Sequence, residues 1–90
     1  MDGWKKINLA KDEIKLGDVV AIRSGMESLW WIGKVFDLST YPDDNGVDKL
    51  VISLICTAFI DDQKKKRRTR LLRNFWEPYI KEIALVKRAA

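Results

Sequence analysis

The sequence predicts a single, mostly β domain: a small antiparallel barrel of five short strands with a short helical turn near the C-terminus. The chain has 90 residues, of which 47% are hydrophobic, enough for one folded domain and too many for a disordered chain. Short runs of β-branched and aromatic residues alternate with Gly, Ser, Asn and Asp, the residues of turns. Gly33 lies in the middle of one such run, where it indicates the sharp bend that a small barrel requires.

Residues 1–15 mix charged residues with isolated apolar ones, so we expect an N-terminal arm, extended or irregular, with Trp4 docked on the barrel. The barrel is expected over residues 16–90. Its first strand is predicted at residues 18–24, where a β-rich run is bounded by Gly17 and Gly25.

The second strand is predicted at residues 30–38, after a short loop rich in Ser and Gly. Alternation places Trp31, Gly33 and Val35 on one face and leaves Trp30, Ile32, Lys34 and Phe36 on the other.

A turn-rich connection follows at residues 39–48, in which Asn45-Gly46 is the strongest turn signal because both residues tolerate positive φ. Residues 49–60 are predicted as a long third strand whose two faces are both largely apolar. A half-exposed antiparallel strand normally alternates with polar residues, so both faces should be covered.

Residues 61–70 are interpreted as a charge-dense connection and residues 71–76 as the fourth strand. Pro78 favours one helical turn over residues 79–82. Residues 83–86 are then a short final strand, although a single C-terminal helix over residues 78–87 fits the same pattern.

The composition argues against an enzyme and against a bound metal or cofactor. The chain has no histidine and one cysteine, so it lacks the ligands of a zinc site, the usual general base and any Ser-His or Cys-His pair. Cys56 lies in an apolar run and is interpreted as a buried small hydrophobe in a reducing compartment. With no long apolar stretch and no signal-peptide pattern, we expect a soluble intracellular protein that does not enter a membrane.

Charge is distributed unevenly along the chain. Residues 1–62 carry a balance of −4 and residues 63–90 a balance of +8. A basic segment of this kind is typical of a chain whose C-terminal part contacts a polyanion. The same charge asymmetry also arises when an acidic and a basic face pair in an oligomer.

Seven cations lie between residues 64 and 73. They are interpreted as phosphate-backbone contacts, as a nuclear import signal, or as a solvated loop balanced by nearby aspartates. No recognition helix is evident, so any nucleic-acid binding should tolerate different sequences. The candidate nucleic-acid-binding residues are Lys64, Lys65, Lys66, Arg67, Arg68, Arg70 and Arg73.

Over residues 16–87 the chain resembles the Tudor family and its SH3-like relatives among chromatin-associated barrels. The resemblance rests on Gly17-Asp18-Val19-Val20-Ala21, on Trp30-Trp31-Ile32-Gly33-Lys34-Val35, and on Pro78-Tyr79-Ile80 with Ile83-Ala84-Leu85-Val86. Similar strand patterns occur in the C-terminal DNA-binding barrel of retroviral integrases.

The resemblance implies an aromatic cage for methylated lysine or arginine, which binds by cation–π attraction. Trp31 matches the cage position on the second strand. Phe59, followed by Asp61, matches the cage position between the third and fourth strands, and Tyr41 is expected to approach the cage from the hairpin. The end of the first strand is Arg23-Ser24 rather than an aromatic residue, so the expected cage is incomplete.

Trp30, Ile32 and Phe36 share a face and predict an apolar stripe on the outside of the barrel. Either the N-terminal arm or another chain should cover such a stripe. These three residues are therefore the candidate protein interface.

Together these observations predict a non-catalytic nuclear binding module that acts on chromatin or nucleic acid. Its expected partners are a DNA or RNA backbone or a chromatin protein, with a methylated tail as one form of the latter. The alternative is a protein-interaction or self-association module, either a homo-oligomer or a complex with another protein, that uses the apolar stripe.

Overall fold

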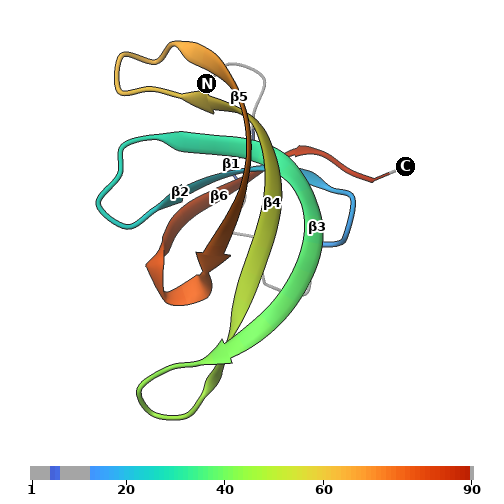
Figure 1. The fold of residues 1–90 in the computed structure, drawn as a ribbon, viewed down its shortest axis with the longest axis vertical. Coiled ribbons are helices and arrows are strands. Elements are labelled where there is room, and N and C mark those ends of the chain that lie inside the picture. Colours follow the sequence, from blue (N-terminus) through green and yellow to red (C-terminus); the bar gives the residue numbers. More distant parts are fainter. Residues whose placement is uncertain (1–4, 7–12, 90) are drawn as a thin grey trace.

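The fold is a single antiparallel sheet in a computed structural model that describes residues 5–6 and 13–89. The sheet order is β1-β6-β2-β3-β4-β5, and a 3-10 turn comes directly before β6. A mostly β class with five principal antiparallel strands is therefore confirmed (Figure 1). The elements are β1 (Lys5–Lys6), β2 (Val19–Ser24), β3 (Trp30–Pro42), β4 (Asp48–Ile60), β5 (Lys66–Trp76), the 3-10 turn (Glu77–Tyr79) and β6 (Ile80–Lys87).

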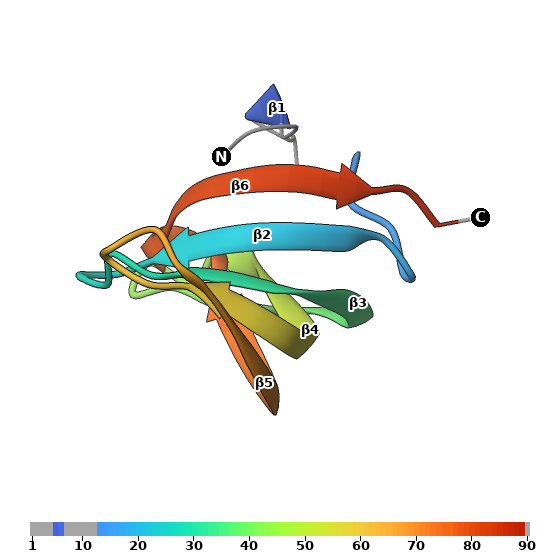
Figure 2. The same cartoon turned by 90° about the horizontal axis from the view of Figure 1, so that it is seen from above.

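The sheet is strongly curved. In Figure 1 the long strands β3 and β4 bend through the molecule, and in Figure 2 β5 runs across the direction of β2 and β6. β2 lies between β3 and β6, so β6, the last strand, returns to pair with β2 near the start of the described chain. Within the described residues no pairing joins β5 to β6 or β1.

Four strands, β3 to β6, are longer than the sequence pattern predicted. β3 continues to Pro42 and β4 starts at Asp48, which confines the expected connection at residues 39–48 to a tight turn. In that turn the Asp43 carboxylate accepts the backbone N–H groups of Asn45 and Val47. β5 begins at Lys66, so the expectation that residues 61–70 form a connection was wrong for residues 66–70. They pair with the end of β4, and pairing partners outweigh the low strand preference of lysine.

The C-terminal segment is a strand, and the helix over residues 78–87 is excluded. The helical turn lies earlier than expected, at Glu77–Tyr79 rather than residues 79–82, with Pro78 near its start, where its missing N–H costs nothing. β1 pairs with Leu85 and Ala84 of β6. Trp4, the residue expected to dock on the barrel, lies outside the described residues.

The buried side chains form two clusters, one on each face of the sheet. The main core contains Trp31, Val35 and Phe75, as alternation on β3 predicted for the first two. The second cluster contains Trp30, Ile32 and three small residues: Ala21, Ala58 and Ala84. A bulge at Thr57 lets Cys56 and Ala58 enter opposite clusters, although both have even numbers and simple alternation would place them on one face.

Gly33 lies where two backbones approach closely. A Cβ at this position would lie 2.8 Å from the carbonyl carbon of Ile55 and 2.9 Å from the Cα of Cys56. Only glycine fits there, because the backbone of β4 approaches closely, next to the bulge that bends β4.

Asp18 is a buried charged residue, and its carboxylate connects the segment before β2 to the segment after β6. Its carboxylate accepts the N–H groups of Lys15 and Ala89 at 3.0 and 2.9 Å and pairs with the Arg88 guanidinium at 3.0 Å. Burial alone would raise the pKa of Asp18, but the hydrogen bonds from Ala89, Lys15 and Arg88 outweigh it and hold the pKa below its ordinary value.

Candidate functional site

Trp31 and Phe59, two of the predicted cage residues, are brought together by the pairing of β3 with β4. They are cross-strand partners, and their ring centroids lie 5.1 Å apart at an angle of 41°. Trp31 is only 9% exposed and belongs to the main core. Its indole nitrogen donates a 2.7 Å hydrogen bond to the carboxylate of Glu27, in the loop before β3.

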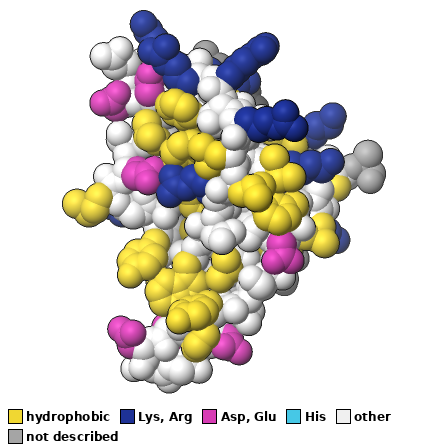
Figure 3. All heavy atoms as spheres, in the orientation of Figure 1, with side chains coloured by type: hydrophobic (Ala, Val, Ile, Leu, Met, Phe, Trp, Pro, Cys, Tyr) yellow, Lys and Arg dark blue, Asp and Glu magenta, His cyan; other side chains and the backbone are white. Residues whose placement is uncertain are grey.

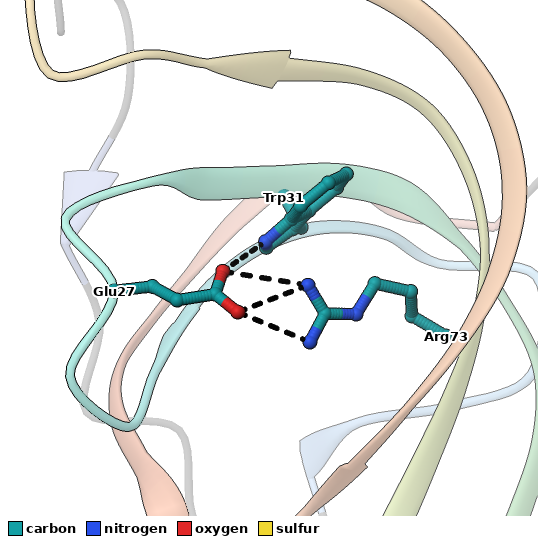
Figure 4. A network of polar contacts seen from close by, with 3 residues as sticks. All are labelled: Glu27, Trp31 and Arg73. Carbon is teal, nitrogen blue, oxygen red and sulfur yellow. Dashed lines mark hydrogen bonds and ion pairs between the residues drawn. The ribbon is translucent and has the colours of Figure 1, made fainter.

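The face of Trp31 is covered by a cation of the chain itself. The guanidinium carbon of Arg73, on β5, lies 4.7 Å from the Trp31 ring centroid and 5.2 Å from that of Phe75. The same guanidinium forms an ion pair with Glu27 at 3.3 Å. Figure 4 shows the carboxylate of Glu27 between the indole nitrogen and the guanidinium. Arg73 thus occupies the position that a ligand cation takes in an aromatic cage.

The other two predicted cage residues do not join this cluster. Tyr41 lies ten residues further along β3, about 30 Å of extended strand from Trp31. Its ring packs edge-on against Trp76 at 5.9 Å. The expectation that Tyr41 shares a site with Trp31 and Phe59 is not met, because the hairpin places it at the opposite end of the strand.

Asp61 binds its own turn rather than pointing its carboxylate at an open site. The carboxylate accepts the backbone N–H groups of Lys65 and Gln63 at 2.8 and 3.0 Å and the Nε–H of Arg67 at 3.2 Å. The hydrogen bond from Lys65 is the main reason that the pKa of Asp61 is lowered. The Asp61 carboxylate thereby shapes the β4–β5 turn, in which Lys64 has a φ of +64°.

Six of the seven candidate phosphate contacts lie together and are exposed, on the β4–β5 turn and the first half of β5. Figure 3 shows Lys and Arg side chains gathered over this end of the molecule. Within the described residues, Arg67 is the one member of this group with an ion pair, to Asp61. Arg73 is separate from them because Glu27 and two aromatic rings hold it. We call the six exposed residues the basic hairpin: Lys64, Lys65, Lys66, Arg67, Arg68 and Arg70.

The predicted apolar stripe does not lie open on the surface. Trp30 and Ile32 are buried in the second cluster, at 9% and 6% exposure, and the chain itself covers them. Phe36 is 43% exposed, since a register shift between Val35 and Asp37 separates it from the alternation of the strand. Trp30 and Ile32 thus lie on the face away from the main core, as alternation predicted, and are already covered, whereas the role of the three residues as a protein interface remains a prediction.

Sequence reasoning missed a third group of residues, at the end of the sheet opposite the basic hairpin. Trp76 packs on Tyr79 at 5.5 Å and on Tyr41, and its indole nitrogen donates to the Tyr41 carbonyl oxygen at 3.1 Å. The density of aromatic residues between Phe75 and Tyr79 was the available signal. Glu27, four residues before Trp31, was also missed, because its partner Arg73 is 46 residues away.

The chain matches no protein-family model, no curated protein and no solved structure. Its function must therefore be argued from its own residues.

The described residues offer no group of three or more His, Cys, Asp or Glu side chains able to hold a metal ion. None of their helical segments has the length and apolar character needed to cross a membrane. Cys56 is buried, and burial raises the pKa of its thiol to about 11, so the thiol is a poor nucleophile.

Proposed function

We propose that this chain is a non-catalytic binding module with an SH3-like, partly open barrel, and that it binds the phosphate backbone of nucleic acid in chromatin. The barrel is supported by the strand order, in which β6 returns to pair with β2, and by the bend of β3 and β4. A nuclear location is part of the proposal, because the basic hairpin has the composition of an import signal.

The observation that carries the proposal is the number of uncompensated cations at one edge of the sheet. Five members of the basic hairpin have no ion pair within the described residues, and β5 pairs on one side only. Lysines on an edge strand also discourage edge-to-edge aggregation, which is the alternative reason for their presence. Five cations without ion pairs, close together at one end of the molecule, suit a line of phosphates.

The binding is expected to depend steeply on salt and little on sequence. Each neutralised phosphate contributes about −0.9 to the slope of log K against log salt, so five contacts give roughly −4 to −5. The described residues contain no α-helix that could place the cations of the basic hairpin in the major groove to read base edges, which supports contact with the backbone.

The test is the fluorescence anisotropy of a labelled duplex at several salt concentrations. Lys65→Gln with Lys66→Gln and Arg68→Gln should weaken binding at low salt and reduce the slope by about 3. Lys81→Gln with Lys87→Gln, two exposed lysines of β6, is the control and should leave both nearly unchanged.

Arg67→Gln should have a smaller effect than Arg68→Gln, because Asp61 already compensates Arg67. An affinity that the triple variant and the control lower equally would show only general attraction between opposite charges and would refute the proposal.

A further inference from the structure

A pocket of about 400 Å³ lies between the β3–β4 turn and the 3-10 turn. One wall is apolar and is formed by Trp76, Pro78 and Tyr79. The other is polar and comes from Asp43 to Asn45 of the turn, with Lys49 and Glu77. Glu77 connects the two walls, since its carboxylate accepts the N–H of Leu50 at 2.9 Å.

The pocket favours a cation over an anion. Three carboxylates line it against one ammonium group, from Asp43, Asp44 and Glu77 against Lys49. The faces of Trp76 and Tyr79 add the negative potential of aromatic rings, which attracts ammonium and guanidinium groups. Asp44 is exposed, and its carboxylate has no hydrogen bond or ion pair within the described residues, so its charge is available.

The basic hairpin lies at the far end of the same molecule. The β3–β4 turn precedes β4 and the β4–β5 turn follows it, so the 13 residues of β4 separate the two. In Figure 1 these turns lie at opposite ends of the longest axis, whose extent is 38 Å. Acidic side chains lie at the lower tip of Figure 3 and basic ones gather at the top. A basic hairpin therefore cannot reach the pocket of its own molecule.

We propose that the pocket binds a lysine or arginine side chain from the basic hairpin of a second copy of this chain. The basic hairpin carries positive charges on long side chains, and five of these cations lack ion pairs within the described residues. The proposal goes beyond nucleic-acid binding, because the pocket lies outside the phosphate-contacting surface.

The contact joins different surfaces of the two copies, so each dimer keeps one free pocket and one free hairpin. Such a head-to-tail arrangement grows into open chains unless the rotation between copies closes a ring. Exposed ion pairs contribute little each and are screened by salt, so the association is weak, concentration-dependent and sensitive to salt.

Nucleic acid competes with this association, because phosphates and the pocket bind the same cations. A saturating duplex therefore disperses the chains of protein, and self-association reduces the number of hairpins free to bind nucleic acid. Each activity regulates the other through the basic hairpin.

The test is sedimentation of the wild-type protein over a range of concentrations at low and high salt. We expect the mean mass to rise with concentration at about 0.05 M salt and to stay near that of a monomer at about 1 M, where the Debye length is about 3 Å. Asp44→Asn with Tyr79→Ala removes a charge and a ring from the pocket and should lower the association constant about tenfold. Asp37→Asn, a substitution of an exposed aspartate on β3, is the matched charge control and should not lower it.

Mixing two defective variants gives the decisive result. The pocket variant keeps its basic hairpin, and the Lys65→Gln, Lys66→Gln, Arg68→Gln variant keeps its pocket. Neither should associate alone, but an equal mixture should form dimers that do not grow further. A monomeric wild type at low salt, an association that the pocket variant leaves intact, or a mixture that stays monomeric would overturn the proposal.

The same variants separate this proposal from the proposed function. At protein concentrations too low for self-association, the pocket variant should bind duplex DNA as the wild type does, whereas the hairpin variant should lose both activities. Should the hairpin variant lose self-association but bind DNA normally, the proposed function fails and the head-to-tail contact stands.

Discussion

Arg73 makes the most contacts of any charged side chain around Trp31, and its removal tests how far this cluster stabilises the fold. Its guanidinium lies over Trp31 and Phe75 and pairs with Glu27, and its side chain is 30% exposed. Arg73→Ala removes the cation–π contacts and the ion pair together. It also leaves the Glu27 carboxylate with the Trp31 indole as its one remaining partner within the described residues.

The expected loss follows from these contacts. A cation over an aromatic face contributes about 0.5–2 kcal/mol, depending on how far it is desolvated. A partly exposed ion pair contributes about 0.2–1 kcal/mol, and Glu27 is 40% exposed. We therefore expect the free energy of unfolding to fall by about 2 kcal/mol, which lowers Tm by roughly 8–16 °C in a domain of this size.

The assay is urea unfolding followed by tryptophan fluorescence, with Glu27→Ala and the double variant completing a cycle. The coupling energy between Glu27 and Arg73 should be about 0.5–1 kcal/mol. Arg68→Ala is the control, because it removes an exposed arginine that has no ion pair in the described residues. It should change the free energy of unfolding by less than about 0.5 kcal/mol. If Arg73→Ala costs no more than Arg68→Ala, the guanidinium does not hold the cluster together and the assignment of its role is wrong.

Three further predictions concern the fold. Gly33→Ala should lower the free energy of unfolding by about 3 kcal/mol or prevent folding, because the new Cβ would collide with the backbone of Ile55 and Cys56. Thermal unfolding measures this loss. A loss below about 1 kcal/mol, the ordinary effect of a strand substitution, would contradict the prediction. Asp18 has a lowered pKa in the folded state, so its ionised form stabilises the fold above its ordinary value of 3.8, and that stability is lost as the pH falls through the lower folded value. Unfolding measured between neutral pH and about pH 3 should show a steeper acid loss for the wild type than for Asp18→Asn, and parallel curves would exclude the role of this carboxylate. The Cys56 thiol, with a pKa of about 11 and a buried position, should react with iodoacetamide at pH 8 far more slowly than in urea-unfolded protein; equal rates would mean that the thiol is accessible in the fold.

Local patterns predicted most of the fold. The glycines at residues 17 and 25 bound the first long strand, Asn45-Gly46 lies in the turn after β3, and alternation separated Trp31 from Trp30 correctly. These features depend on neighbours within a few residues, so the sequence alone contains them.

The features that sequence reasoning missed depend on contacts between distant segments. The strand over residues 66–70 exists because β4 offers pairing partners, and its own run of charged residues gave no sign of it. The register shifts at Phe36 and Thr57 change which face a side chain occupies, and no simple alternation predicts them.

The candidate site follows the same division. The basic hairpin was visible as a run of charges, and its exposure follows from that composition. The closing of the predicted cage by Arg73 and Glu27 was not visible, because it joins residues 46 positions apart. The pocket at Trp76 and Tyr79 was likewise hidden, since the β3–β4 turn supplies its other wall.

The central claim is that the basic hairpin contacts phosphate, and an amide NMR titration with a short duplex at two salt concentrations tests it most directly. The account predicts shifts that are concentrated at residues 64–70, that weaken strongly at the higher salt, and that spare Arg73. A spectrum in which residues 64–70 do not move at low salt, or in which the shifts are unaffected by salt, would contradict it.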